Sequence, residues 1–259
     1  MTSFMGIVAR LSLAALITSI AIALVAGIGT RFGWWSYDLG LFVIFPVAVY
    51  AGLAALGLGL LWILIALFSG GGPGALSAVI GFVGSIALLW VPLDDYYRVN
   101  IEQTLPPIHD ISTDTEHAPA FIASPGPGEI IPPVYDGLKR IHYAGQTNAM
   151  ETLQKLAYGE IKPSWQLQTT SAKLFRRALT AARRMGWNIV AMRQDSRSGI
   201  IQATATTLLF GLTDDIVLRV QPAGIGARLD IRSRSRAGGN DFGRNAARIR
   251  AYMKKLASS

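Results

Sequence analysis

The side chains best suited to chemistry gather near the carboxyl end of the chain. Arginines alternate with smaller residues in "ARLDIRSRSRAGGNDFG", and "DDIVLRV" places two aspartates and an arginine shortly upstream. Planar guanidinium groups bind phosphates and carboxylates through paired hydrogen bonds, and the amides at the start of a helix attract anions. We therefore expect a site that binds an anion or a partner. Its members are Asp215, Arg219, Arg228, Asp230, Arg232, Arg234, Arg236, Asn240 and Asp241.

The same residues also fit a structural role. Salt-bridge networks resemble functional sites, and a ladder of arginines and aspartates that braces a strand, a turn and the next helix would give the same pattern. Asp241 would then satisfy the helix amides that an anion could otherwise bind. The sequence leaves both interpretations open.

A second group of polar side chains lies in "IHDISTDTEHAPAF". Its members His109, Asp110, Asp114, Glu116 and His117 could ligate a divalent cation, but their spacing fits no calcium-loop or zinc motif. We expect instead a solvated segment whose aspartate, serine and threonine side chains form local turns. Neither a metal nor a cofactor is expected.

Recognisable catalytic motifs are absent from the sequence. It contains no cysteine and no GxSxG, HExxH, Walker A or GxGxxG element in a usable context. Asp214 and Asp215 are neighbours, so in a strand they point to opposite faces and cannot act as a pair. We expect a non-catalytic protein. The alternative is an envelope hydrolase-type enzyme that uses Asp215, His142 or the acids of "TDTE".

Three apolar segments precede this polar region. They cover about 8–30, 39–68 and 75–93, and "SGGGPG" separates the second from the third. Because about 20 apolar residues in a helix cross the hydrocarbon core of a bilayer, we expect three transmembrane helices. Pro46 predicts a tilt, a kink or an interfacial start of the second. A signal peptide followed by a buried hairpin is the alternative, which so long a charge-free run disfavours.

Charge and aromatic residues indicate an orientation. Residues 1–105 contain three arginines and four acids, a net charge of −1, so residues 106–259 carry +9 when the whole chain carries +8. Arg10 favours a cytoplasmic amino end, although Arg31 favours the reverse. Aromatic clusters after the first and third spans then share one membrane face. We expect a multi-pass protein of the bacterial inner (plasma) membrane with a periplasmic carboxyl-terminal domain.

The region after the spans divides into a linker and a folded domain. Prolines recur in 94–135, and proline disfavours helix and central strand, so we expect an extended linker there. Within 136–259 the pattern predicts a strand at 164–170, a helix from Thr170 or Ser171 to Gly186, four strands and a helix at 242–256. This order predicts a membrane-anchored α+β protein with a β-α-β(4)-α antiparallel-sheet domain, like TBP-like and helix-grip folds.

The last hairpin allows a register to be predicted. Pairing Val220 with Ala227 places the apolar residues of both strands on one face. The other face then pairs Asp215 with Arg232, which is favourable, and Arg219 with Arg228, which is unfavourable.

Several stretches resemble a bacterial and plastid family catalogued as domain of unknown function fourteen-ninety-nine. They are "IHDISTDTEHAPAF", "AGQTNAMETLQKLAYGEIKP", "MGWNIV", "GIIQATATTLLFGLTDDIVLRV" and "ARLDIRSRSRAGGNDFGRNAARIRAYM", which together cover about 105–256. The resemblance implies a compact domain, often exported or membrane-attached, and no known reaction. Gly159 and Glu160 depart from its usual proline and aspartate, so it assigns no role to an acid there.

These observations favour an integral membrane protein whose extramembrane domain binds an anionic or apolar envelope partner, a lipid or a protein, without catalysis. Basic residues near a bilayer attract anionic lipid. Nucleic-acid binding is disfavoured, because the stretch 228–241 contains no aromatic residue on which bases would stack.

Overall fold

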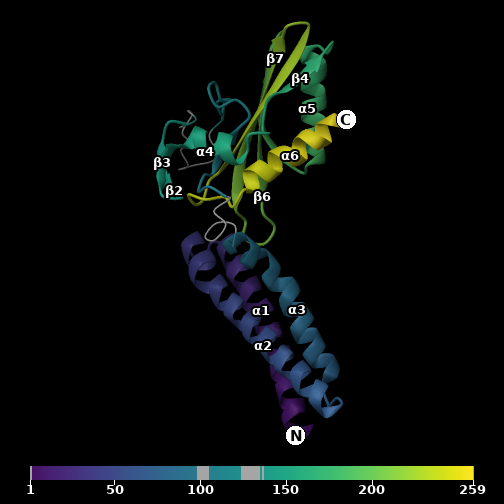
Figure 1. Cartoon of the computed structure of the whole chain (residues 1–259). Coiled ribbons are helices and arrows are strands. Elements are labelled where there is room, and N and C mark those ends of the chain that lie inside the picture. The colour runs from purple at the N-terminus through teal and green to yellow at the C-terminus, as the bar shows by residue number, and fades with distance from the viewer. Residues whose placement is uncertain (1, 98–104, 124–134, 136, 259) are drawn as a thin grey trace. The chain divides into compact units, whose positions relative to one another are not determined.

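The computed structural model describes residues 2–97, 105–123, 135 and 137–258. The chain forms two compact units, which Figure 1 shows. Unit 1 comprises Met1–Tyr97 together with Thr207–Gly211, and unit 2 comprises Arg98–Thr206 and Leu212–Ser259.

Unit 1 contains three long apolar helices, as predicted. They are α1 (Thr2–Arg31), α2 (Phe45–Ser69) and α3 (Ala75–Tyr96), and all three are long and apolar enough to cross a membrane. A short π-helix, η1 (Leu39–Ile44), runs directly into α2. Pro46 lies in the first turn of α2, directly after η1.

Small residues let the three helices approach closely. The Ser12 hydroxyl of α1 donates to the carbonyl of Ala55 in α2 at 2.8 Å, and that of Ser19 donates to Ala48 at 2.6 Å. A Cβ on Gly59 of α2 would lie 2.8 Å from Cβ of Phe82 in α3. Packing by small residues and hydroxyl hydrogen bonds is typical of helices that associate in lipid.

Gly59 and its neighbour Gly57 give a matched test of this packing. A Cβ on Gly57 would meet nothing within 4 Å. We expect Gly59→Val to force α2 away from α3 at a cost of about 1–3 kcal/mol, whereas Gly57→Val leaves the bundle intact. Thermal unfolding of the full-length protein in detergent micelles, followed by circular dichroism, measures both. Equal losses in the two variants would contradict the observed packing.

Unit 2 is built on a six-stranded antiparallel sheet with the order β1-β8-β7-β6-β5, and β4 pairs with β8 beside β1. Helices α5 and α6 cover one face of the sheet (Figure 1). The predicted succession of strand, helix, four strands and helix is confirmed. The elements are β4 (Ser164–Leu167), α5 (Ser171–Arg184), β5 (Asn188–Gln194), β6 (Gly199–Thr206), β7 (Thr213–Ala223), β8 (Gly226–Ser235) and α6 (Arg244–Ala257).

The predicted register of the β7–β8 hairpin is wrong by two residues. Val220 pairs with Leu229, not with Ala227, because Ala223 pairs with Gly226 and leaves a two-residue turn. Gly224 adopts φ +56° in that turn, a conformation that two-residue hairpin turns require and glycine tolerates. A shift of two residues keeps every side chain on its predicted face, but it changes all the charge pairs across the strands.

Four elements of unit 2 were not predicted. They are β1 (Asp110–Ser112), the hairpin β2 (Arg140–Tyr143) and β3 (Gln146–Ala149), and α4 (Met150–Ala157). The strand β1 lies inside the segment that we expected to be a linker. The proline-rich stretch 124–134 of that expected linker lies outside the described residues.

The segment 105–123 packs against the sheet. Leu105, Ile108 and Ile111 belong to the buried core. The buried amide of Gln202 in β6 accepts hydrogen bonds from the backbone N–H groups of 122 and 123 at 2.7 and 2.8 Å, and it donates to the carbonyl of 123 at 2.8 Å. We call 105–123 the strap.

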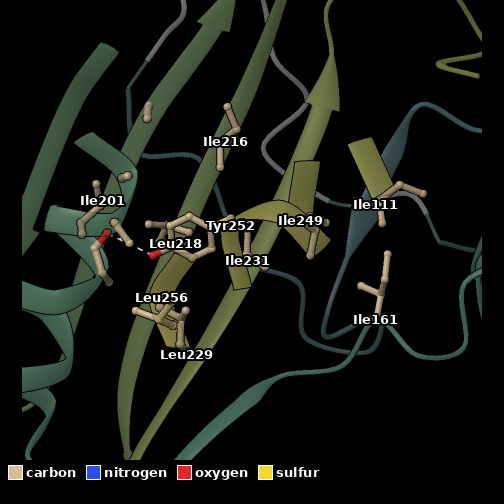
Figure 2. Packing of buried hydrophobic residues seen from close by; sticks show 14 of the residues in the cluster. Ile111, Ile161, Ile201, Ile216, Leu218, Leu229, Ile231, Ile249, Tyr252 and Leu256 are labelled. Carbon is tan, nitrogen blue, oxygen red and sulfur yellow. Dashed lines mark hydrogen bonds between the residues drawn. The ribbon is translucent and has the colours of Figure 1, made fainter. Parts of the chain in front are cut away.

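Between the sheet and the two helices lies an apolar core, part of which Figure 2 shows. Ile216, Leu218 and Ile231 project from the sheet toward Ile249 and Tyr252 of α6. The Tyr252 hydroxyl donates to the carbonyl of Ala178 in α5 at 3.1 Å, so the two helices are joined to each other as well as to the sheet.

Candidate functional site

The predicted site residues of β7 and β8 lie together on the face of the sheet that α5 and α6 do not cover. Asp215 and Arg219 of β7 share this face with Arg228, Asp230, Arg232 and Arg234 of β8, because alternate residues of a strand point the same way. In the observed register Arg219 is opposite Asp230, and Asp215 is opposite Arg234. Neither of the cross-strand pairs that we predicted, Asp215 with Arg232 and Arg219 with Arg228, exists in this register. We call this set of side chains the ladder.

At the turn end of the ladder, two arginines share two aspartates. Arg219 donates to Asp230 from Nε at 3.1 Å and from Nη2 at 2.9 Å, and Arg228 donates to it from Nε at 2.8 Å. Asp114 of the strap accepts from both arginines. Burial raises the pKa of Asp114, but the backbone N–H of His117 and the guanidinium of Arg228 outweigh it and hold that pKa below its ordinary value.

At the centre of the ladder, Arg232 is completely buried. Its Nε and Nη2 donate to the two carboxylate oxygens of Asp110 at 2.9 and 2.7 Å, and its Nη1 donates to the carbonyl of Pro119 at 3.3 Å. The guanidinium also lies over the rings of Phe121 and Tyr135, at 4.7 and 5.6 Å from their centres. Cation–π contacts of this kind are strengthened when both groups are desolvated.

At the carboxyl end of β8, Asp215 pairs with Arg236. The guanidinium donates from Nε and Nη2 to the two carboxylate oxygens at 2.8 and 2.9 Å. Nε of Arg234 lies 4.0 Å from Oδ2 of Asp110. The arginines that we predicted to be exposed on a strand face are therefore paired with carboxylates of the same chain.

Asn240 and Asp241 accept hydrogen bonds from backbone N–H groups around the start of α6, but neither is the N-cap that we expected. The Asp241 carboxylate accepts from the backbone N–H groups of Gly243 at 2.9 Å and Asn245 at 2.8 Å, and Asn240 accepts from Phe242. The helix itself begins two residues later than we expected, with Gly243 as its N-cap. Burial raises the pKa of Asp241.

A second polar network involves residues of the first turns of α6. Asn245 donates to the backbone carbonyl of His109 at 3.1 Å, and its amide oxygen accepts from the hydroxyl of Ser233 at 2.6 Å. Arg248 donates to Ser233 at 3.0 Å and also pairs with Asp214. This network joins α6, the sheet and the strap.

Asp110 and Asp114 of the strap are the partners of the ladder that the sequence did not reveal. We interpreted them as part of a solvated segment, whereas they neutralise arginines more than a hundred residues away. One signal could have revealed them. In "IHDIS" the apolar Ile108 and Ile111 flank the acid, which is typical of a strand that packs on a core and not of a solvated loop.

Helices α5 and α6 carry a concentration of exposed positive charge. Five residues of α5 and five of α6 are basic, and neither helix contains an acid. Arg248 and Arg250 pair with Asp214 and Glu160 of neighbouring segments. Arg244 and Arg250 of α6 are exposed. The other exposed basic residues of the two helices are Lys173, Arg176, Arg183, Arg184, Lys254 and Lys255. We call these six the basic layer.

The fold and its charges define a class of protein: three helices of membrane-spanning length joined to an antiparallel α+β domain with an internally neutralised arginine ladder. A family model described as protein of unknown function (DUF1499) matches residues 110–256. The chain belongs to this family. No curated protein sequence matches it significantly. The matched region begins at Asp110, so it covers β1 and the residue of this chain whose carboxylate binds Arg232.

The pair of Arg232 and Asp110 can be tested against a neighbour on the same strand. We expect Arg232→Met to destabilise unit 2 by about 3–5 kcal/mol, because it leaves a buried carboxylate uncompensated. Arg234→Met, which removes a partly exposed guanidinium, should cost about 0–1 kcal/mol. Urea unfolding of the full-length protein in micelles, followed by hydrogen-exchange protection of β8 peptides, measures both. Adding Asp110→Leu to Arg232→Met should recover much of the loss, and no recovery would contradict the pairing.

Proposed function

We propose that the protein is a multi-pass membrane protein whose extramembrane domain binds an anionic lipid surface without catalysing a reaction. The basic layer carries this proposal. Six exposed cationic side chains project from two packed helices that contain no acid. Near a bilayer, each basic residue contributes about 1 kcal/mol of attraction to anionic lipid, and a membrane anchor keeps the domain close to such a surface.

The ladder is less suited to an external anion than the basic layer. Asp110, Asp114 and Asp230 accept hydrogen bonds from Arg219, Arg228 and Arg232 of the ladder at 2.7–3.3 Å, and Asp215 accepts from Arg236 at 2.8 Å. An incoming phosphate or carboxylate would have to displace these buried carboxylates, whose desolvation is already compensated. We therefore assign the ladder a structural role and the basic layer the binding role.

Lipid fits the basic layer better than nucleic acid does. Proteins that bind single strands combine cationic grooves with exposed aromatic rings on which bases stack. The only aromatic residues of α5 and α6 are Phe175 and Tyr252. Both are buried in the core, so the layer offers charge without a stacking surface.

We further propose that the domain is periplasmic and that the spans lie in a bacterial inner membrane. Arg10 near the amino end supports a cytoplasmic start, and an odd number of spans then exports the carboxyl-terminal domain. An alkaline phosphatase fused after Ser259 should be active, because this enzyme needs the oxidising periplasm to form its disulfides. An inactive but stable fusion would indicate the opposite orientation, with a cytoplasmic carboxyl-terminal domain.

Lipid binding can be measured with the full-length protein in phosphatidylcholine nanodiscs. Co-sedimentation with vesicles that contain phosphatidylglycerol should exceed co-sedimentation with phosphatidylcholine vesicles, and high salt should abolish the difference. Changing Lys173, Arg176, Arg183 and Arg184 to Gln should lower the partition coefficient by about 100-fold or more. Glutamine is a good helix former, so α5 should persist.

The matched control removes four exposed charges from other surfaces of unit 2. It changes Lys139, Lys162, Arg193 and Arg197 to Gln, and we expect most of the binding to remain. An equal loss in this variant would show that only net charge matters and would overturn the assignment to the basic layer. Tighter binding to an oligonucleotide than to anionic vesicles at the same salt would overturn the choice of lipid.

A further inference from the structure

The turn between β6 and β7 is unusually apolar for a connection between two strands. It reads "TLLFGL", from Thr207 to Leu212. Turns between strands are usually polar and rich in glycine, asparagine and aspartate, yet four of these six residues are apolar. Leu208 has 89% of its surface exposed, so the rest of the chain buries almost none of this side chain.

The contacts of this turn belong to unit 1. Thr207–Gly211 clusters with the long apolar helices. Nη1 of Arg31, the last residue of α1, donates to the carbonyls of Thr207 at 3.0 Å and Leu208 at 2.7 Å. The ring of Phe210 meets that of Phe45, at the start of α2, edge to face with 5.7 Å between their centres.

The same end of α1 carries the features of a membrane interface. Phe32 and Trp34, directly after the helix, expose about two thirds of their surfaces. Trp35 follows them, and its ring packs edge-on against that of Trp34. Tryptophan and other large aromatic residues concentrate where the hydrocarbon core meets the headgroups. A turn held by Arg31 lies at this level, where its exposed leucine would face lipid.

We propose that Thr207–Gly211 is an interfacial membrane anchor, with Leu208 inserted among the lipids beside the end of α1. The occupant of this apolar surface is the bilayer that contains α1, because the surface is continuous with the apolar spans. Arg31 satisfies two carbonyls of the turn, which removes part of the cost of placing a turn's backbone at the edge of the hydrocarbon. The extramembrane domain would thus have a membrane attachment besides the chain that follows α3.

This inference rests on the proposal that the three helices span a bilayer, but not on lipid binding by the basic layer. The chain contains no cysteine, so single cysteines can be introduced into the full-length protein without removing any. Leu208→Cys carries the test position. Ile225→Cys is the matched control, because Ile225 lies in the turn between β7 and β8 and is 78% exposed. Ile20→Cys, in the middle of α1, reports on the spans.

Each variant is spin-labelled and reconstituted into phosphatidylcholine vesicles, and the accessibility of the label to oxygen and to a water-soluble nickel complex is measured. Oxygen concentrates in lipid and the nickel complex is excluded from it. We expect the ratio of oxygen to nickel accessibility at Leu208 to be severalfold higher than at Ile225 and to approach that at Ile20.

The other results separate the alternatives. High nickel accessibility at Leu208 with a lipid-like Ile20 would place the turn in water and overturn this inference alone. Low accessibility to both reagents at Leu208 would indicate a protein contact, such as a second copy of the chain, and would also overturn it. A water-like label at Ile20 would overturn the proposed membrane insertion itself.

Discussion

The buried guanidinium of Arg232 is the constraint on which the rest of unit 2 depends. A charge that has lost all contact with water must be paired and hydrogen-bonded, or the fold cannot tolerate it. In β8 the partner comes from the strap, since Asp110 accepts two of its hydrogen bonds and Pro119 a third. The residues after 136 therefore do not form the whole domain. The strap, which precedes them in the chain, is part of its fold.

The strap also explains why the central strands β7 and β8 of an antiparallel sheet are buried on both faces. One face packs against α5 and α6 through Ile216, Leu218 and Ile231, as an α+β fold requires. The strap covers part of the opposite face, which is polar, through ion pairs and through the buried amide of Gln202. Polar groups at that face are acceptable because each finds a charged or hydrogen-bonding partner.

The sequence predicted which face each residue of β7 and β8 occupies, but not which residues are opposite one another. Alternation fixes the face, and any shift by two residues preserves it, so the apolar pattern could not choose between pairing Val220 with Ala227 or with Leu229. The turn at Gly224 decides this. The packing of the strap on the sheet could not be predicted from the sequence for a different reason. Its prolines argued against regular structure, and its partners lie more than a hundred residues away.

The distribution of charge follows from these pairings. The region after residue 105 carries a net charge of +9, but the arginines that looked most available for binding are occupied by aspartates of the strap and of the sheet. The excess positive charge therefore appears on the outer surface of α5 and α6, where the helices contribute no acid. A cluster of charged residues in a sequence thus indicates a binding surface only where the charges have no partner within the same chain. Because the arginines of the strands have such partners, the candidate binding surface lies on the helices and not on the strands.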